Sequence, residues 1–156
     1  MRVWLDADAQ VFDGWGPYGW RRMRLALSEW NSLRLPVRFV EARSAQQSDI
    51  IVDVIASIPA PDDSSGRDQA AVTSLTYDQS GTILKARVLI AVTAPNGLRY
   101  PLYDQQANLL HELGHAIGLP HITETGAVMA TRRTSYQLTG ADIALARRHY
   151  GGCRGT

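Results

Sequence analysis

The sequence predicts a protein of the α+β class, on three observations. Five segments have the apolar patterns of strands, namely 3–7, 36–41, 49–55, 71–77 and 82–92. Between Pro17 and Arg34, apolar residues recur at steps of three and four, which is typical of an amphipathic helix. Two more helices are predicted toward the C-terminus, one ending near Gly118 and one from about Thr139 to Tyr150.

Length and composition narrow the class of protein. The chain has 156 residues, 45% of them hydrophobic and 20% charged, which suits a single globular domain with a full-sized core. The net charge of +1 gives no indication of a nucleic-acid or membrane partner, and no apolar run approaches the roughly 20 residues of a membrane span. Cys153 is the single cysteine, so no internal disulfide is expected and stability must come from packing and metal.

The first predicted helix carries several tryptophans. Trp20 and Trp30 share one stripe with Met23, Leu27 and Leu33. Tryptophans can form a carbohydrate-stacking surface, but helical spacing on one stripe favours core packing. Trp15 lies off this stripe, and the pattern assigns it no position.

The predicted strands differ in how much of each is expected to be buried. Segment 36–41 alternates like a half-buried strand, whereas 49–55 is nearly continuously apolar, as expected for a strand covered on both faces. Segments 71–77 and 82–92 flank turn residues at 78–81 and are predicted to form a hairpin. Because 71–77 is short and rich in Thr and Ser, we expect it at an exposed edge of the sheet.

The polar loop from Pro59 to Asp68 contains three aspartates. Aspartate clusters can bind calcium, but these lack the regular spacing of a known calcium loop. A solvated loop is therefore the favoured interpretation.

The strongest functional signal is His111-Glu-Leu-Gly-His115-Ala-Ile-Gly118-Leu-Pro-His121. Histidines four apart on a helix project from one face, so His111 and His115 can reach one ion. Gly118 is placed to end the helix in a left-handed conformation, which lets the chain turn and bring His121 round as a third ligand. Three imidazoles and one open position describe a catalytic rather than a structural zinc site, with Glu112 placed to hold a water on the ion.

The helix that carries the motif is expected to begin at Asp104 as its N-cap. Its core-facing side is predicted from helical spacing and consists of Ala107, Leu110, Leu113, Ala116 and Ile117.

The zinc motif followed by Met129 resembles the metzincin clan of zinc endopeptidases, which combine this motif with a Met-turn. The tail from Leu138 to Gly151, with Asp142-Ile near its start and Tyr150-Gly at its end, is similar to the matrixins, the matrix-metalloproteinase-like family. The resemblance implies a twisted five-stranded mixed sheet with one antiparallel edge strand, packed on two long helices, and a C-terminal helix after the Met-turn. It also implies an N-terminal subdomain at 1–121 and a C-terminal one at 122–156 within one catalytic domain.

The same resemblance implies roles for individual residues. One Zn²⁺ would be held by His111, His115 and His121, with Glu112 as the general base for peptide hydrolysis. Met129 would form an apolar floor beneath the metal; taken alone, it would be an ordinary core residue.

Three further residues have weaker assignments. Asp142 resembles the helix aspartate that braces the Met-turn, with helix-dipole stabilisation as the alternative. Tyr136 is a candidate for the pocket that binds the residue after the scissile bond, with an exposed loop tyrosine as the alternative. Arg132 and Arg133 would bias that pocket toward acidic side chains, although a solvated loop is the favoured interpretation.

The sequence also departs from the matrixin pattern. No histidine precedes His111, so we expect one zinc rather than the two that matrixins usually carry. Cys153 is at the wrong end to match the propeptide cysteine of that family. Thr131 stands where matrixins commonly have proline and astacin-like metzincins have tyrosine, and Ile122 where serine is usual. We therefore interpret the chain as a compact or minimal matrixin.

The expected partner is a peptide or protein substrate, bound in extended form along edge strand 71–77 of a monomer. Two alternatives remain open: an inactive zinc-binding interaction domain, and a zinc hydrolase of a non-peptide bond. The resemblance favours secretion, whereas the opening residues 1–6 do not have the pattern of an export signal.

Overall fold

The computed structural model describes residues 1–6, 12, 15–59, 69–131 and 135–151. The aspartates of the predicted polar loop, the arginine pair 132–133 and Cys153 lie outside the described residues. Within the described part, none of the helices is both long and apolar enough to cross a membrane.

Five strands form one mixed sheet in the order β2-β1-β3-β5-β4. All neighbouring pairs are parallel except β4 and β5, which are antiparallel. β4 is therefore the antiparallel edge strand that the sequence predicts, and the five-stranded mixed sheet is confirmed. The strands are β1 (Arg2–Leu5), β2 (Val40–Glu41), β3 (Ile50–Ile55), β4 (Ala71–Tyr77) and β5 (Ile83–Ala91).

The turn between β4 and β5 is closed by its own side chains. The Asp78 carboxylate accepts hydrogen bonds from the backbone N–H groups of Ser80 and Thr82, at 2.8 and 2.9 Å. Gly81 has a φ of +83°, a left-handed conformation that glycine adopts at little cost. These contacts confirm the predicted hairpin.

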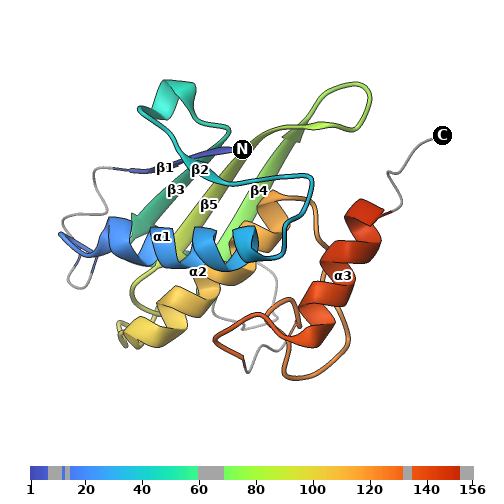
Figure 1. Cartoon of the computed structure of the whole chain (residues 1–156). Coiled ribbons are helices and arrows are strands. Elements are labelled where there is room, and N and C mark those ends of the chain that lie inside the picture. The colour runs from blue at the N-terminus through green and yellow to red at the C-terminus, as the bar shows by residue number, and fades with distance from the viewer. Residues whose placement is uncertain (7–11, 13–14, 60–68, 132–134, 152–156) are drawn as a thin grey trace.

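Two long helices lie against the same face of the sheet (Figure 1): α1 (Gly19–Ser32) and α2 (Leu102–Ala116). The stripe of α1 is buried at Met23, Leu27 and Trp30, which confirms core packing for that tryptophan. Trp30 also joins the two helices, because its indole N–H donates to the carbonyl of Leu110 at 2.9 Å.

Trp15, to which the sequence assigned no position, is fully buried. Its indole N–H donates to the side-chain oxygen of Gln105 at 2.5 Å. The Gln105 amide group in turn donates to the carbonyl of Tyr100 at 2.7 Å. This buried polar chain connects the segment before α1 with the start of α2.

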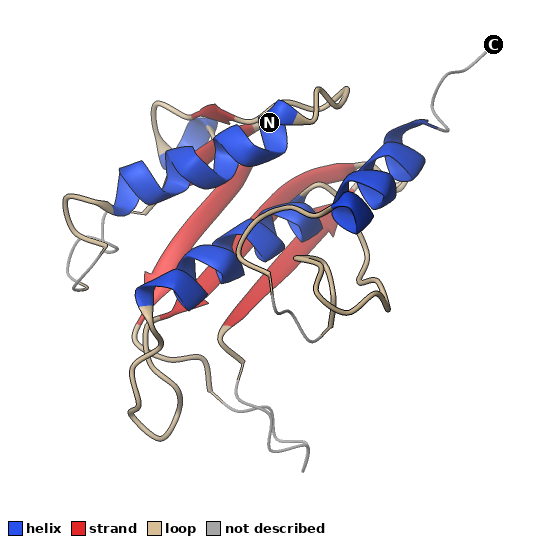
Figure 2. Ribbon diagram, turned by 60° about the horizontal axis from the view of Figure 1, so that its bottom comes forward, coloured by secondary structure: helices blue, strands red, loops and turns tan. Residues whose placement is uncertain are grey.

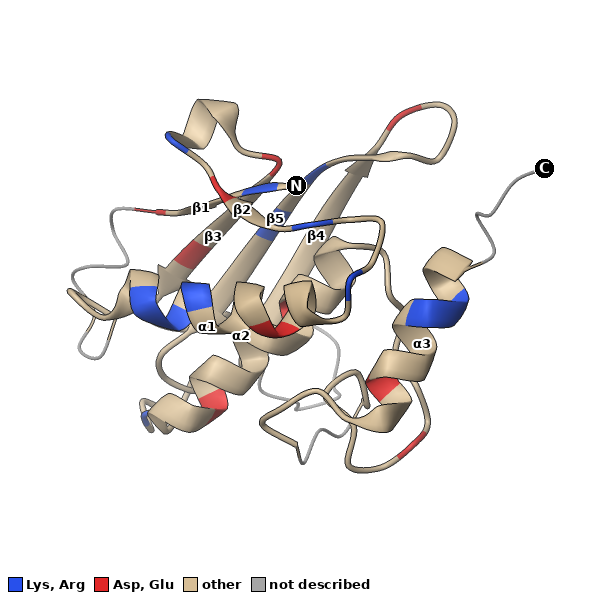
Figure 3. Cartoon of the chain, in the orientation of Figure 1, with Lys and Arg blue, Asp and Glu red and all other residues tan. Residues whose placement is uncertain are grey.

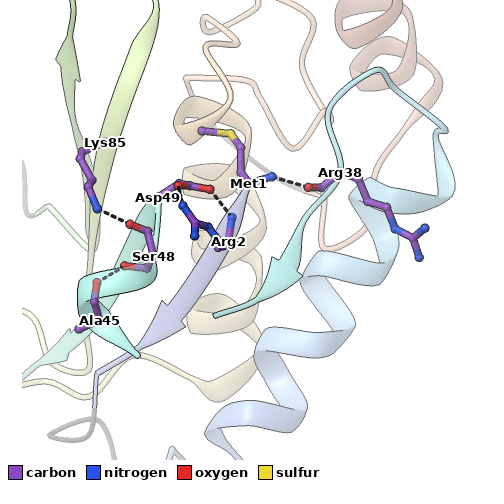
Figure 4. Close-up of polar contacts among 7 residues, drawn as sticks. All are labelled: Met1, Arg2, Arg38, Ala45, Ser48, Asp49 and Lys85. Carbon is purple, nitrogen blue, oxygen red and sulfur yellow. Dashed lines mark hydrogen bonds and ion pairs between the residues drawn. The ribbon is translucent and has the colours of Figure 1, made fainter. Parts of the chain in front are cut away.

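Polar contacts at one end of β1 join it to neighbouring segments (Figure 4). Asp49 accepts hydrogen bonds from both the backbone N–H and the guanidinium of Arg2, at 2.6 and 3.0 Å. Burial tends to raise the pKa of Asp49, but the bonds from Arg2 outweigh it, so the pKa lies below its ordinary value. The short 3-10 helix η2 (Ala45–Gln47) precedes this point, and the Lys85 ammonium donates to the carbonyl of Ser48 beside it.

The strand predicted at 36–41 is wrong in its extent, since β2 contains only Val40 and Glu41. The side chain of Asn31 explains the difference. Its amide group donates to the carbonyl of Phe39 and its oxygen accepts from the Phe39 N–H, at 2.9 and 2.8 Å. Both backbone groups of Phe39 are thus bonded to a side chain of α1 rather than to β1.

The predicted N-cap of α2 is also wrong. Pro101 occupies that position, the helix begins at Leu102, and Asp104 lies in the first turn. There its negative charge interacts favourably with the positive end of the helix dipole.

The C-terminal helix α3 (Gly140–Gly151) lies on the opposite side of α2 from α1 (Figure 2). It has an acidic residue, Asp142, in its first turn and basic residues in its last (Figure 3), which matches the sign of the helix dipole at both ends. The hydroxyl of Tyr150 donates to the carbonyl of Ile117 at 2.7 Å, so α3 is bonded to the end of α2.

Candidate metal centre

The candidate metal centre lies at the C-terminal end of α2. His111 and His115 lie one turn apart, and Gly118 has a φ of +85°. The N–H of Gly118 donates to the His115 carbonyl at 2.8 Å and the N–H of Leu119 to the Gly114 carbonyl at 3.1 Å. These two bonds form a Schellman motif, which ends the helix and turns the chain back toward His121.

The three histidines converge through the same ring atom. The Nε2 atom of His111 lies 3.0 Å from that of His115 and 3.1 Å from that of His121, and the third pair is also 3.1 Å apart. Zinc–nitrogen bonds are about 2.0–2.1 Å long, so three nitrogens this close together could all bind one zinc ion. The described side chains therefore fit a zinc ion.

Backbone carbonyls orient two of the rings. The Nδ1 of His111 is 2.5 Å from the carbonyl of Val128, and the Nδ1 of His115 is 2.7 Å from that of Leu119. A carbonyl only accepts, so in each ring Nδ1 carries the proton and the neutral ring presents the lone pair of Nε2. The sequence could not identify these acceptors.

The electrostatics of the centre favour a cation. Burial lowers the pKa of His115 below its ordinary value, which keeps the ring neutral and able to bind metal. Lone pairs on His111 and His115 that face each other at 3.0 Å repel, and a positive ion between them turns this repulsion into attraction. The arrangement is thus suited to a bound metal ion.

Glu112, the predicted general base, lies on the side of α2 that faces β4. Its side chain is buried, with 6% of the residue exposed. The hydroxyl of Thr73, on β4, donates to its carboxylate oxygen Oε2 at 2.6 Å. Nothing in the sequence pattern connected Thr73 with the motif, because 39 residues separate the two.

Met129 and Asp142 contact segments next to the histidines. Met129 is fully buried, and its sulfur packs so closely against Gly114 that a Cβ at that glycine would lie 2.4 Å from Sδ. The buried Asp142 carboxylate accepts hydrogen bonds from the backbone N–H groups of Val128 and Met129, at 3.0 and 2.8 Å. Asp142 therefore fixes the same peptide segment whose Val128 carbonyl orients His111.

The structure places Tyr136 at the opposite end of α2 from the histidines. Its ring packs edge-on against Tyr103, with 5.2 Å between centroids, and half of the residue is exposed. Tyr103 lies eight residues before His111, about 12 Å along the helix axis. The assignment of Tyr136 to a substrate pocket stays a prediction.

Comparison with known proteins agrees with the geometry. A family model of the matrixins matches residues 20–151, which include α1 from its second residue, the zinc motif and α3. None of the curated proteins matches the chain. The match covers most of the 156 residues and indicates a zinc-dependent peptidase. The chain belongs to the matrixin family.

Proposed function

We propose that this matrixin is a zinc-dependent endopeptidase. The observation that carries the proposal is the convergence of three Nε2 atoms within 3.1 Å of one another, with a carboxylate, Glu112, directly after the first ligand in the chain. A purely structural zinc site needs four protein ligands and has no use for a neighbouring base. Three ligands and a base are what hydrolysis requires.

Zinc, when bound by the three histidines, supplies a Lewis acid that polarises a carbonyl and lowers the pKa of water to about 7. The carboxylate of Glu112 then takes a proton from the attacking water and passes it to the leaving amine. Val128 and Leu119 keep two of the rings in the metal-binding tautomer through their carbonyls.

The remaining site residues pack against, or shape, the segments that carry the three histidines. Met129 packs under the turn of α2 that contains Gly114, between the two helical ligands. Asp142 fixes the peptide that ends in Met129, and Gly118 provides the turn to His121. In this proposal their roles are structural, and only Glu112 handles a proton.

The proposed substrate is a peptide in extended form, bound alongside β4. Two features support this choice. β4 is the last strand of the sheet, so it can add a further strand through backbone hydrogen bonds. It also packs against α2, and Thr73 from this strand contacts Glu112 directly. A peptide on β4 would therefore lie close to the base.

The test is cleavage of a denatured protein such as casein, followed by a peptide library. We expect cleavage by the zinc-loaded protein, loss of it with a chelator, and a fall of at least about 100-fold in kcat for Glu112→Ala with zinc still bound. Glu41→Ala is the matched control, because Glu41 is an exposed carboxylate on β2 that forms an ion pair with Arg24 of α1. Elemental analysis should find one zinc per chain.

Two outcomes would contradict the proposal. Cleavage that persists in Glu112→Ala would remove the assigned base. Tight zinc binding without cleavage of any peptide pool would favour an inactive zinc-binding domain or a hydrolase of another bond.

A further inference from the structure

The contact between Thr73 and Glu112 joins the edge of the sheet to the proposed base. Thr73 is half-buried on β4, with its side chain toward α2, whereas the next residue, Ser74, is exposed. Its hydroxyl oxygen lies 2.6 Å from Glu112 Oε2 and 3.1 Å from the Glu112 backbone carbonyl. A hydroxyl has one proton to donate. The shorter contact, to a charged acceptor, is the stronger of the two.

The position of this hydroxyl is set by rigid structure. Thr73 pairs with Val88 in the antiparallel ladder between β4 and β5. Threonine is branched at Cβ, so its χ1 angle has few alternatives in a strand. The last torsion of a glutamate side chain, in contrast, is broad and allows its carboxylate to rotate. A fixed donor on Oε2 therefore restricts the rotation of the carboxylate.

We propose that Thr73 is a positioning residue for Glu112. By holding Oε2, its hydroxyl fixes the plane of the carboxylate, so that the base meets the attacking water in one orientation. It also couples that orientation to β4, the strand along which we propose that substrate binds. This inference rests on the proposed peptidase function and assigns Thr73 no contact with substrate.

A purely structural contact between β4 and α2 would behave differently from a positioning contact. Loss of a structural contact lowers stability and leaves the chemistry of the folded protein unchanged. Loss of a positioning contact lowers kcat, leaves KM and zinc affinity nearly unchanged, and changes the environment of the carboxylate.

Three variants separate these cases. Thr73→Val removes the hydroxyl and keeps the shape, and Thr73→Ser restores a hydroxyl at the same position. Thr93→Val is the matched control, because the Thr93 hydroxyl also donates a hydrogen bond, to the carbonyl of Ala56 at 2.7 Å. Thr73→Ala replaces Thr73→Val if the valine variant does not fold.

Four quantities are measured for each variant: kcat and KM on a peptide that the wild type cleaves, zinc affinity by competition with a chelator, and the Glu112 carboxyl ¹³C resonance. The resonance is recorded in metal-free protein and assigned by its loss in Glu112→Gln, so it reports the contact independently of activity. We expect Thr73→Val to lower kcat by about 10- to 100-fold, the range for a lost hydrogen bond to a charged group. KM and zinc affinity should change by less than about threefold.

In Thr73→Val the Glu112 resonance should also shift. Thr73→Ser should recover most of kcat and the wild-type resonance, and Thr93→Val should match the wild type throughout.

The inference is overturned by an unchanged kcat in Thr73→Val, by a rise in KM alone, or by a serine variant as impaired as the valine variant. Each of these results leaves the peptidase function intact, provided that Glu112→Ala is inactive. A wild-type protein that cleaves no peptide overturns both.

Discussion

The packing around Gly114, which lies between His111 and His115 in the chain, leaves no space for a side chain. A Cβ at this position would lie 2.4 Å from the sulfur of Met129, 3.1 Å from its terminal methyl and 2.9 Å from the ring of Trp30. Both neighbours are buried, and Trp30 is also held by its hydrogen bond to Leu110. Gly114→Ala therefore requires α2 to move away from Met129 and Trp30.

Two opposing effects set the change in the free energy of unfolding. Alanine is favoured over glycine inside a helix by about 1 kcal/mol. Overpacking a well-filled core costs about 1–3 kcal/mol, and contacts under 3 Å to two buried side chains belong at the upper end of that range. We expect Gly114→Ala to lower the free energy of unfolding by about 1–2 kcal/mol. Displacement of His115 from its carbonyl partner should also weaken zinc binding by about 10-fold or more.

The free energy of unfolding is measured by urea titration of the metal-free protein, and zinc affinity by chelator competition. Gly140→Ala, at the start of α3, is the matched control because a Cβ there meets nothing within 4 Å. A second test combines Gly114→Ala with Met129→Ala, where the loss caused by Gly114→Ala should shrink. A Gly114→Ala protein with wild-type stability and zinc affinity would show that the close approach of Met129 has no consequence.

Other contacts lead to further predictions. Asp142→Asn should cost about 2–4 kcal/mol of unfolding free energy, because an amide donor would face backbone N–H groups in a buried site; urea titration measures it, and a loss below 1 kcal/mol would contradict it. Trp15→Phe should cost about 1–3 kcal/mol by removing the partner of the buried Gln105 oxygen, and equal stability of Trp15→Phe and wild type would refute this. The pKa of Asp49 is depressed in the folded state, so its contribution to stability is complete above about pH 5 and is lost as the pH falls through the folded value; the difference in stability between wild type and Asp49→Asn should shrink between pH 5 and about pH 3. Zinc removal should lower Tm, and readdition should restore it.

Much of the fold could be predicted because its signals are local. Strands 49–55, 71–77 and 82–92 have apolar patterns and turn residues that fix their type and nearly their limits, and β3, β4 and β5 confirm them. The exceptions are a side-chain contact and a cap position, which apolar patterns do not encode. Segment 36–41 has the pattern of a strand, but the side chain of Asn31 bonds both backbone groups of Phe39 and shortens β2.

The candidate metal centre likewise has one part that the sequence predicts and another part that it does not. The spacing of His111 and His115 is a property of helix geometry, and Gly118 marks the turn to His121, so the candidate ligand set can be read from the sequence. The groups that orient the ligands come from the carbonyls of Val128 and Leu119, and backbone atoms have no signature in a sequence pattern. Tyr136 was a candidate for the pocket, with an exposed loop tyrosine as the alternative, and its ring contact with Tyr103 has no signature in the sequence.

The sequence by itself determined the chemistry: which atoms can bind a metal, which carboxylate follows the first of them, and where a glycine turns the chain. Each of these depends on residues within one or two helical turns, where spacing alone fixes geometry. Only the tertiary structure decided what surrounds that chemistry. Thr73 meets Glu112 across 39 residues and Trp15 meets Gln105 across 90. Such contacts depend on how the sheet and helices pack, because that packing brings distant segments of the chain together.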